Sequence, residues 1–303
     1  MTVLEPAGFA AHTIAGVAWS LFIGSLLIFT GVMALLAMSL RRHAGAINAR
    51  HWIIGGGIIF PAIVLCVLMS YTAVRSAQLT RPAPANALVI SVTAKMWWWE
   101  VRYRLPDGGQ VVLANEIHIP VGYPVVIGLS STDVIHSFWV PQLAGKMDMV
   151  PGRTNQLQLS ASAPGVYRGQ CAEYCGEQHA RMAMHVVVHE TAAFDAWLAA
   201  QARPASVPTT VLARAGQQAF EAHRCTACHT VRGIAVNGRL GPDLTHVGSR
   251  LFLGAGTLRN EPGAMPSWLA HVQTLKAGAR MPAFDVSDAA GLAAIGAYLE
   301  QLK

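Results

Sequence analysis

Two long apolar stretches dominate the first quarter of the chain. Residues 14–40 and 52–74 contain no charged side chain, and each is longer than the roughly 20 residues that a helix needs to cross the hydrocarbon core of a bilayer. A secretory signal peptide would be shorter than the first stretch and would follow a basic segment, which this sequence lacks. We therefore predict a transmembrane helical hairpin over residues 1–81.

The segment between the two stretches carries the charges that set their orientation. It contains Arg41, Arg42 and Arg50, whereas no Lys or Arg precedes the first stretch. Basic residues favour the cytoplasmic side of a membrane, so the N-terminus and everything after residue 74 are expected outside. Pro61 and the glycines before it are tolerated in a membrane helix when a neighbouring helix covers the loosened backbone, which indicates a membrane-embedded partner.

Short alternating and β-branched runs replace the apolar stretches after a proline-containing link at residues 81–86. Turn residues separate these runs, notably at residues 106–109. The runs are 88–93, 99–103, 110–113, 124–129, 155–159 and 184–189. We predict a small antiparallel β-barrel or sandwich over residues 82–203, closed by a helix at residues 191–201.

The composition agrees with a chain that lies partly in lipid. Of its 303 residues, 53% are hydrophobic and only 13% are charged, which is unusual for a purely soluble protein. The net charge of +6 is not gathered into the dense basic stripe that a phosphate backbone requires. Nucleic-acid binding is therefore not expected.

A compact thiol motif marks the last part of the chain, residues 204–303. Cys225, Cys228 and His229 form a C-x-x-C-H sequence, in which two thiols attach a c-type haem and the adjacent imidazole becomes an axial ligand. A redox dithiol or half of a zinc site would share the cysteine spacing, but no second cysteine pair follows downstream. The motif therefore predicts covalent haem c.

The flanks of this motif resemble those of class I cytochrome c. Gly216 and Phe220 precede it on a helical pattern, residues 241–244 read G-P-D-L, and residues 295–299 lie on a closing helix. The resemblance covers roughly residues 211–303. It implies an all-α domain in which the two terminal helices cross through small and aromatic residues, and in which a proline carbonyl orients the ligating imidazole.

The sixth iron ligand is expected to be a methionine in the second half of this domain. Met281 and Met265 are both followed by proline, and the sequence K-A-G-A-R-M-P around Met281 better matches the loop that presents the axial methionine in the cytochrome family. We predict Met281 as the ligand and Met265 as a packing residue. Three histidines could also ligate but are more simply exposed or hydrogen-bonded: His223, His246 and His271.

A second cluster of soft ligands lies upstream of the haem motif. It consists of Cys171, Cys175, His179 and Met182. Thiolate, thioether and imidazole together suit copper better than Mg or Ca. A Cys171–Cys175 disulfide is the alternative in an oxidising compartment, but it leaves the imidazole and the thioether without a purpose. His136, at the edge of a predicted strand, can supply a second imidazole.

This ligand pattern resembles the dinuclear CuA site of cytochrome c oxidase subunit II. Its spacing is C-x3-C-x3-H-x2-M with an earlier histidine in the same β-domain, and residues 95–99 and 146–153 match further family signatures. With the helical hairpin and the terminal cytochrome included, the resemblance to the haem-fused, caa3-type subunit II covers essentially the whole chain. It implies a cupredoxin-like fold for the β-domain.

The resemblance also assigns the copper ligands. Two bridging thiolates, those of Cys171 and Cys175, would be shared by both coppers. The other ligands form one pair for each copper: His136 with Met182, and His179 with the backbone carbonyl of Glu173. Such a site carries electrons and does not activate substrate, because no coordination position is left open.

Further family roles fall on single residues. The side chain of Glu173 would help hold a Mg or Mn ion at the boundary with the catalytic subunit. Trp97 would receive electrons from cytochrome c, although the tryptophan run at 97–99 could equally anchor the domain at the membrane interface. Residues 50–61 lack the carboxylate that many members use for proton uptake. Protons would then enter through the catalytic subunit or by way of His51.

The expected function is that of subunit II of a haem-copper oxygen reductase in the bacterial inner membrane, with the copper and haem domains outside. Electrons from an external cytochrome c or similar donor would pass through haem c and CuA to subunit I; subunit III is a further expected partner. The alternative is a tethered module of another reductase, such as a nitric oxide reductase. Three other classes fit less well. Nitrous oxide reductase would need a large second catalytic domain, for which this sequence has no room, and the quinol oxidase subunit has lost the copper-binding cysteines that are retained here. A copper-delivery protein would not need the haem motif.

Overall fold

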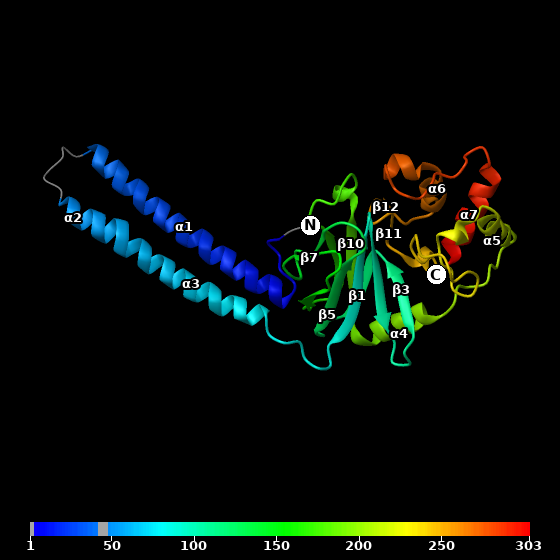
Figure 1. Cartoon of the computed structure of the whole chain (residues 1–303), viewed down its shortest axis with the longest axis horizontal. Helices are drawn as coiled ribbons and strands as arrows, with labels where there is room; N and C mark the ends of the chain where they lie inside the picture. Colours follow the sequence, from blue (N-terminus) through cyan, green and yellow to red (C-terminus); the bar gives the residue numbers. More distant parts are fainter. Residues whose placement is uncertain (1–2, 42–47) are drawn as a thin grey trace. The chain divides into compact units, whose positions relative to one another are not determined.

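The computed structural model describes residues 3–41 and 48–303, and its elements are labelled in Figure 1. The chain divides into two compact units. Ala10–Pro82 form one unit, and Ala83–Lys303, with the residues before Ala10, form the other. Arg42, one of the basic residues of the predicted cytoplasmic loop, lies outside the described residues.

Two long apolar helices make up most of the unit Ala10–Pro82. The first is α1 (Phe9–Arg41), and the second runs through α2 (Ala49–His51), η1 (Trp52–Ile59) and α3 (Phe60–Leu79). Both are long and apolar enough to cross a membrane, as the sequence predicts. The Ser20 and Tyr71 hydroxyl oxygens lie 3.3 Å apart and link the two helices.

The second apolar helix widens into a π-helix just before its proline. Pro61 has no N–H to donate, and its ring crowds the carbonyl four positions earlier, which belongs to Gly57. The π-helix η1 contains this glycine and ends at Ile59. Its wider turns relieve the crowding, so the helix continues into α3 without a break.

The β-domain is a sandwich of two five-stranded sheets, coloured cyan to green in Figure 1. The first sheet has the order β3 (Gln110–Ala114), β2 (Trp98–Arg104), β1 (Leu88–Lys95), β5 (Val125–Ser131) and β8 (Asn155–Leu159). The second has the order β4 (Glu116–Pro120), β10 (Ala183–His189), β9 (Gly165–Cys171), β6 (His136–Trp139) and β7 (Met147–Met149). Helix α4 (Thr191–Ala202) follows β10.

The strand pairing is not purely antiparallel. β1 pairs with β5 in parallel, and β10 pairs with β4 in parallel. The predicted antiparallel arrangement is wrong at these two pairs. Strands β2, β3 and β4 separate β1 from β5 in sequence, so the chain has room for the long crossover that a parallel pair requires.

Four strands of the sandwich are not among the runs quoted from the sequence: β4, β6, β7 and β9. Of these, β6 begins at His136, which was expected at the edge of a strand. Strands β6 and β7 contain four and three residues, which is too short to show an alternating pattern. Strand β9 contains Gly165 and Gly169, and glycine weakens a strand signal. Gly169 is nevertheless required, because a Cβ there would lie 2.8 Å from the carbonyl oxygen of Trp139 on the neighbouring strand.

Aromatic packing in the sandwich core fixes the position of β6. Trp99 and Phe138 are fully buried and meet edge-to-face with their ring centroids 6.0 Å apart. Trp99 also packs against the imidazole of His136, at a centroid distance of 6.3 Å. Close-packed aromatic neighbours hold a side chain in one orientation, so the core presents His136 in a defined direction.

The last part of the chain, called the helical domain below, is coloured yellow to red in Figure 1. Its elements are α5 (Val211–Ala222), η3 (Cys225–Ala227), η4 (Val247–Ser249), β11 (Phe252–Leu253), β12 (Leu258–Arg259), α6 (Ala264–Leu275) and α7 (Ala289–Gln301). Helices α5 and α7 cross closely, because a Cβ at Gly216 would collide with the Ala294 carbonyl oxygen. Phe220 meets Tyr298 edge-to-face at 5.6 Å. The crossing expected from the cytochrome resemblance is therefore present.

Candidate metal centre and haem-attachment site

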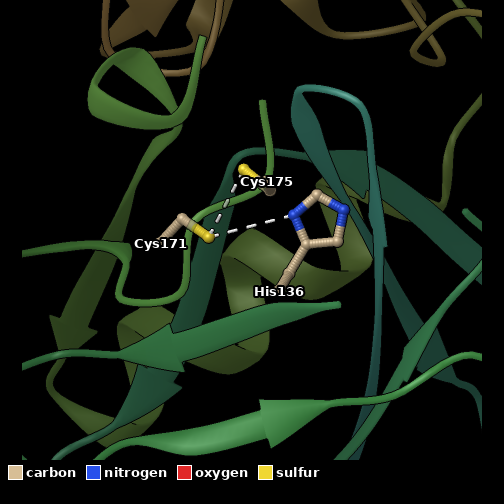
Figure 2. A group of neighbouring side chains, drawn as sticks. All are labelled: His136, Cys171 and Cys175. Carbon is tan, nitrogen blue, oxygen red and sulfur yellow. Dashed lines mark hydrogen bonds between the residues drawn. The ribbon is translucent and has the colours of Figure 1, made fainter. Parts of the chain in front are cut away.

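Three of the predicted copper ligands converge from different parts of the β-domain. His136 begins β6, Cys171 ends β9, and Cys175 lies in the segment between β9 and β10. Figure 2 shows the three side chains pointing toward one another. Their exposed fractions are 0%, 3% and 3%. The pairing of β6 with β9 brings the imidazole of one strand beside the thiol of the other.

Cys171 lies at the centre of this group. Its Sγ is 3.8 Å from His136 Nδ1, 3.2 Å from the Glu173 carbonyl oxygen and 3.8 Å from Cys175 Sγ. A disulfide needs a sulfur–sulfur distance of about 2.05 Å, and both cysteines are free, so the disulfide alternative is wrong in this structure. Among residues 3–41 and 48–303, one group of three or more His, Cys, Asp or Glu residues has all its ligand atoms within 4.8 Å of one another: His136, Cys171 and Cys175.

Cys175 gathers the two remaining side-chain ligands. Its Sγ lies 3.7 Å from His179 Nδ1 and 4.0 Å from Met182 Sδ. The short 3-10 helix η2 (His179–Arg181) begins at the first of these residues and ends just before the second, so its turn brings both toward the sulfur. Two thiols, two imidazoles, a thioether and a carbonyl oxygen form a mainly soft donor set, which fits copper.

The surroundings of Cys171 favour its thiolate form. The hydrogen-bonding contact with Cys175, and a further one with His136, outweigh the effect of burial and lower the pKa of Cys171 to about 3. The same contact raises the pKa of Cys175, because the two sulfurs share one proton. Thiolate is the form that binds a metal, so metal binding would displace the remaining proton.

Asp133 is a site residue that the sequence reasoning missed. Its Oδ1 lies 2.8 Å from His136 Nε2, and its Oδ2 accepts a 2.8 Å hydrogen bond from the Met96 amide. Partial burial opposes its charge, but the hydrogen bonds from His136 and from backbone amides lower the pKa of Asp133. A carboxylate on the outer nitrogen fixes the orientation of a ligating imidazole. The available signal was an acidic residue three positions before a ligand histidine.

Trp97 packs against the ligand loop. Its indole Nε1 donates a 2.8 Å hydrogen bond to the Cys175 carbonyl oxygen, and the side chain is half-buried. Trp99 lies in the core, and Lys95 Nζ lies 4.9 Å from the ring centroid of Trp98. The three tryptophans therefore have different neighbours. Trp97 contacts the loop that carries Cys175, Trp98 makes a cation–π contact with Lys95, and Trp99 lies in the core.

The two ends of Glu173 face different partners. Its backbone carbonyl points to Cys171, whereas its carboxylate lies 3.6 Å from Lys146 Nζ and its side chain is 44% exposed. This division is the one that the family resemblance implies. The role of the carboxylate in holding Mg or Mn stays a prediction.

The haem-attachment motif lies on a turn after α5. Cys225 and Cys228 are half-buried free thiols. His229 Nδ1 donates a 2.8 Å hydrogen bond to the Pro242 carbonyl oxygen, as the resemblance implies, which leaves Nε2 to bind iron. Gly241 permits this approach, because a Cβ there would lie 2.5 Å from His229 Cε1. Burial lowers the pKa of His229, which favours the neutral imidazole that ligates a metal.

The two candidate methionines differ in burial. Met265 is 2% exposed within the hydrophobic core, and Met281 is half-buried against the edge of that core. The burial of Met265 agrees with a packing role, and iron ligation by Met281 stays a prediction. Two competing histidines have other neighbours: His246 bonds to a backbone carbonyl, and His223 lies 3.5 Å from a carboxylate.

Two family models match parts of the unit that contains residues 83–303. Residues 102–191 match the model described as cytochrome C oxidase subunit II, periplasmic domain, and residues 213–303 match cytochrome c. A solved structure, the periplasmic domain of subunit II of cytochrome oxidase (CoxB) of Bradyrhizobium japonicum, aligns with 31% identity and a TM-score of 0.37. It covers 40% of this chain and 96% of that one.

Curated relatives extend the similarity along the chain. Cytochrome c oxidase subunit 2 of Alkalihalophilus pseudofirmus is 38% identical over 218 residues, which cover 72% of this chain and 62% of that protein. Cytochrome c oxidase subunit 2 of Bacillus sp. (strain PS3) is 31% identical over 240 residues, which cover 74% of this chain and 66% of that protein. This chain therefore spans just under two thirds of the length of these relatives. It carries a cytochrome c oxidase subunit II periplasmic domain at residues 102–191 and a cytochrome c domain at residues 213–303.

Proposed function

We propose that the chain is the electron-transfer subunit of a caa3-type cytochrome c oxidase. The route runs from an external cytochrome c or similar donor, by haem c and dinuclear CuA, to subunit I, which reduces O2 to water with proton translocation. The observation that carries the proposal is a closed set of copper ligands on the same chain as an oriented haem-binding imidazole. When bound, the two groups supply one-electron redox chemistry.

At the copper site, the proposed holders are the residues that converge around the two sulfurs. Cys171 and Cys175 would supply the two thiolates. His136 with Met182, and His179 with the Glu173 carbonyl, would complete the ligand sets of the two coppers. Protein atoms occupy every proposed position and both thiols are buried, so the site has no room for a substrate. Such a closed and rigid set suits electron transfer, because the ligands move little when the charge changes.

At the haem site, Cys225 and Cys228 would hold haem c through thioether links, and His229 and Met281 would bind its iron. The Pro242 carbonyl supports this assignment, because it holds the proton on His229 Nδ1 and keeps Nε2 free for iron. Met281, which would supply the thioether sulfur, lies on a separate segment between α6 and α7.

Three further assignments complete the proposal. Trp97, bonded to the Cys175 carbonyl, is the point at which electrons reach the copper site. Glu173 helps hold a Mg or Mn ion with subunit I. The two apolar helices anchor the chain in the bacterial inner membrane beside subunits I and III, with the copper and haem domains on the periplasmic side.

The test is turnover of the complex purified in detergent with its native partners. Oxygen consumption driven by reduced cytochrome c is expected, together with loss of this activity in a variant that lacks copper. Turnover of nitric oxide without oxygen consumption would overturn the proposal in favour of a tethered module of a nitric oxide reductase.

A further inference from the structure

A buried lysine joins the helical domain to the copper-ligand loop. Lys276 directly follows α6 and is 4% exposed. Its Nζ donates hydrogen bonds of 2.7 Å to the Arg181 carbonyl oxygen and 2.9 Å to the Gly254 carbonyl oxygen. In return, the Arg181 guanidinium donates to the Leu275 carbonyl oxygen. A lysine is almost never fully buried unless its charge is satisfied, so this reciprocal contact is a specific join.

The join lies between two proposed ligands. On the β-domain side, Arg181 immediately precedes Met182, a proposed copper ligand. On the helical side, Lys276 begins the segment that leads to Met281, the proposed axial ligand of haem. A hydrogen-bonded contact therefore connects the two ligand-bearing segments directly.

The same segment of the helical domain approaches Trp97. A Cβ placed on Gly278 would lie 2.5 Å from Glu177 Oε2 and 3.7 Å from Trp97 Cζ3. Gly278 also has a φ of +72°, which glycine adopts without strain. On its other side, Trp97 Nε1 is bonded to the carbonyl of Cys175. Trp97 thus lies between the helical domain and a proposed bridging ligand.

Further individual contacts also join the two domains. Three of them involve strands β4 and β10: the Leu251 amide to Glu116 Oε1 at 2.6 Å, the Ala183 amide to the Ala255 carbonyl at 3.0 Å, and the His185 ring stacked on Phe252 at 4.3 Å. Glu116 and His185 are each 5% exposed. Buried polar groups with satisfied hydrogen bonds fix one arrangement of the two surfaces.

We propose that Lys276 and Arg181 clamp residues 275–278 of the cytochrome domain onto the Trp97 face of the copper domain. The donor that reaches Trp97 is then the chain's own cytochrome domain rather than a separate protein. Lys276 is a positioning residue for this transfer, since it contacts neither proposed cofactor. The inference rests on the proposed function. When bound, haem c and copper would supply the one-electron redox chemistry, in which one group gives up the electron that the other accepts; Lys276 and Arg181 would hold the segments that carry their proposed ligands.

The test uses Lys276→Met in the full-length chain within the complex. Methionine keeps an unbranched side chain of similar length but donates no hydrogen bond. Lys303→Met is the matched control, because Lys303 is exposed at the C-terminal end. A photoreductant reduces the haem, and the delay before the near-infrared copper band bleaches reports the transfer between domains. We expect this transfer to slow about 10-fold or more in Lys276→Met, with unchanged copper and haem contents and potentials, and no change in Lys303→Met.

An unchanged rate in Lys276→Met, with both groups fully loaded, would overturn the clamp. If that variant does not assemble, hydrogen exchange in the wild-type complex decides instead. Strong protection of the Leu251 and Ala183 amides, which bond across the join, supports the clamp, and exchange as fast as in exposed amides overturns it. A wild-type chain that binds no copper overturns the proposed function, and the clamp with it.

Discussion

The two cysteine pairs of the second unit lie in opposite electrostatic surroundings. Cys171 and Cys175 are buried, and the hydrogen bond between them lowers the pKa of Cys171. Cys225 and Cys228 are half-buried, and burial raises the pKa of Cys225. The first pair is surrounded by imidazole, thioether and carbonyl donors, whereas the second lies on and beside the short turn η3 (Cys225–Ala227).

This difference matches two kinds of bond. A metal ligand must be a thiolate. The neighbours of Cys171 favour that form, and Cys175 would lose its proton when metal binds. Attachment of haem through thioethers makes covalent bonds, so the second pair needs access and no lasting negative charge. The role of a cysteine pair therefore depends on the side chains around it as well as on the spacing of the two residues.

The largest effect is expected from breaking the first pair alone. Cys175→Ser removes the sulfur of a proposed metal ligand, which lies 3.8 Å from Cys171 Sγ. We expect near-complete loss of copper with covalent haem retained, because Cys225 and Cys228 are untouched. Copper quantification and haem staining measure this. Cys66→Ser, on α3, is the control that keeps both groups, and full copper content in Cys175→Ser would contradict the ligand assignment.

The second region is tested through its two methionines. Met281→Ala is expected to change the haem spin state and slow electron input without releasing copper, because it removes the proposed axial sulfur. Met265→Leu conserves core volume and should leave the visible spectrum unchanged. A normal spectrum in Met281→Ala, together with a changed one in Met265→Leu, would exchange the roles of the two residues.

A smaller effect should sharpen the account of the first pair. Asp133→Asn removes the charge beside His136 Nε2 and is expected to weaken copper binding about 10- to 100-fold, while the ligands themselves remain. Competition with a copper chelator measures the affinity. Asp148→Asn, an exposed acidic residue paired with Lys146, should bind copper like the wild type. Equal affinity in both variants would remove Asp133 from the site.

The smallest effect concerns acid stability of the β-domain. His118 Nδ1 lies 2.7 Å from His189 Nε2, and burial, then the charge of His118, lowers the pKa of His189 from its usual 6.5. The unfolded chain therefore takes up this proton first, so the stabilisation present above about pH 6.5 is lost as the pH falls through the lowered pKa. Denaturant unfolding followed across this range should show a shallower loss for His189→Gln. The exposed His271→Gln should match the wild type.

Features that depend on the spacing of residues close together in the chain were predictable from the sequence. The two apolar stretches, the C-x-x-C-H motif and the cysteine–histidine–methionine spacing each depend on residues close together in the chain. Strand β8 was predicted with the bounds that it has in the structure, because its residues alternate and turn residues flank it. The proposed ligand set therefore followed from motifs and resemblance, and the structure adds its distances.

Features that depend on distant contacts were not predictable. The parallel pairing of β1 with β5 is decided by the path of three intervening strands. The hydrogen bond between Asp133 and His136 is local, three positions apart, but it also depends on a turn geometry that the spacing alone does not fix. Nothing in the sequence marks Lys276 as buried, since its acceptors are carbonyls of Arg181 and Gly254, which any residue could supply.

The central claim is that one chain holds both a dinuclear copper relay and haem c. Copper quantification together with a near-infrared and visible spectrum of the purified full-length chain tests this most directly. We expect a near-infrared copper band that bleaches on reduction, in the same molecule as c-type haem bands. Visible haem bands without the dinuclear copper signature would contradict it.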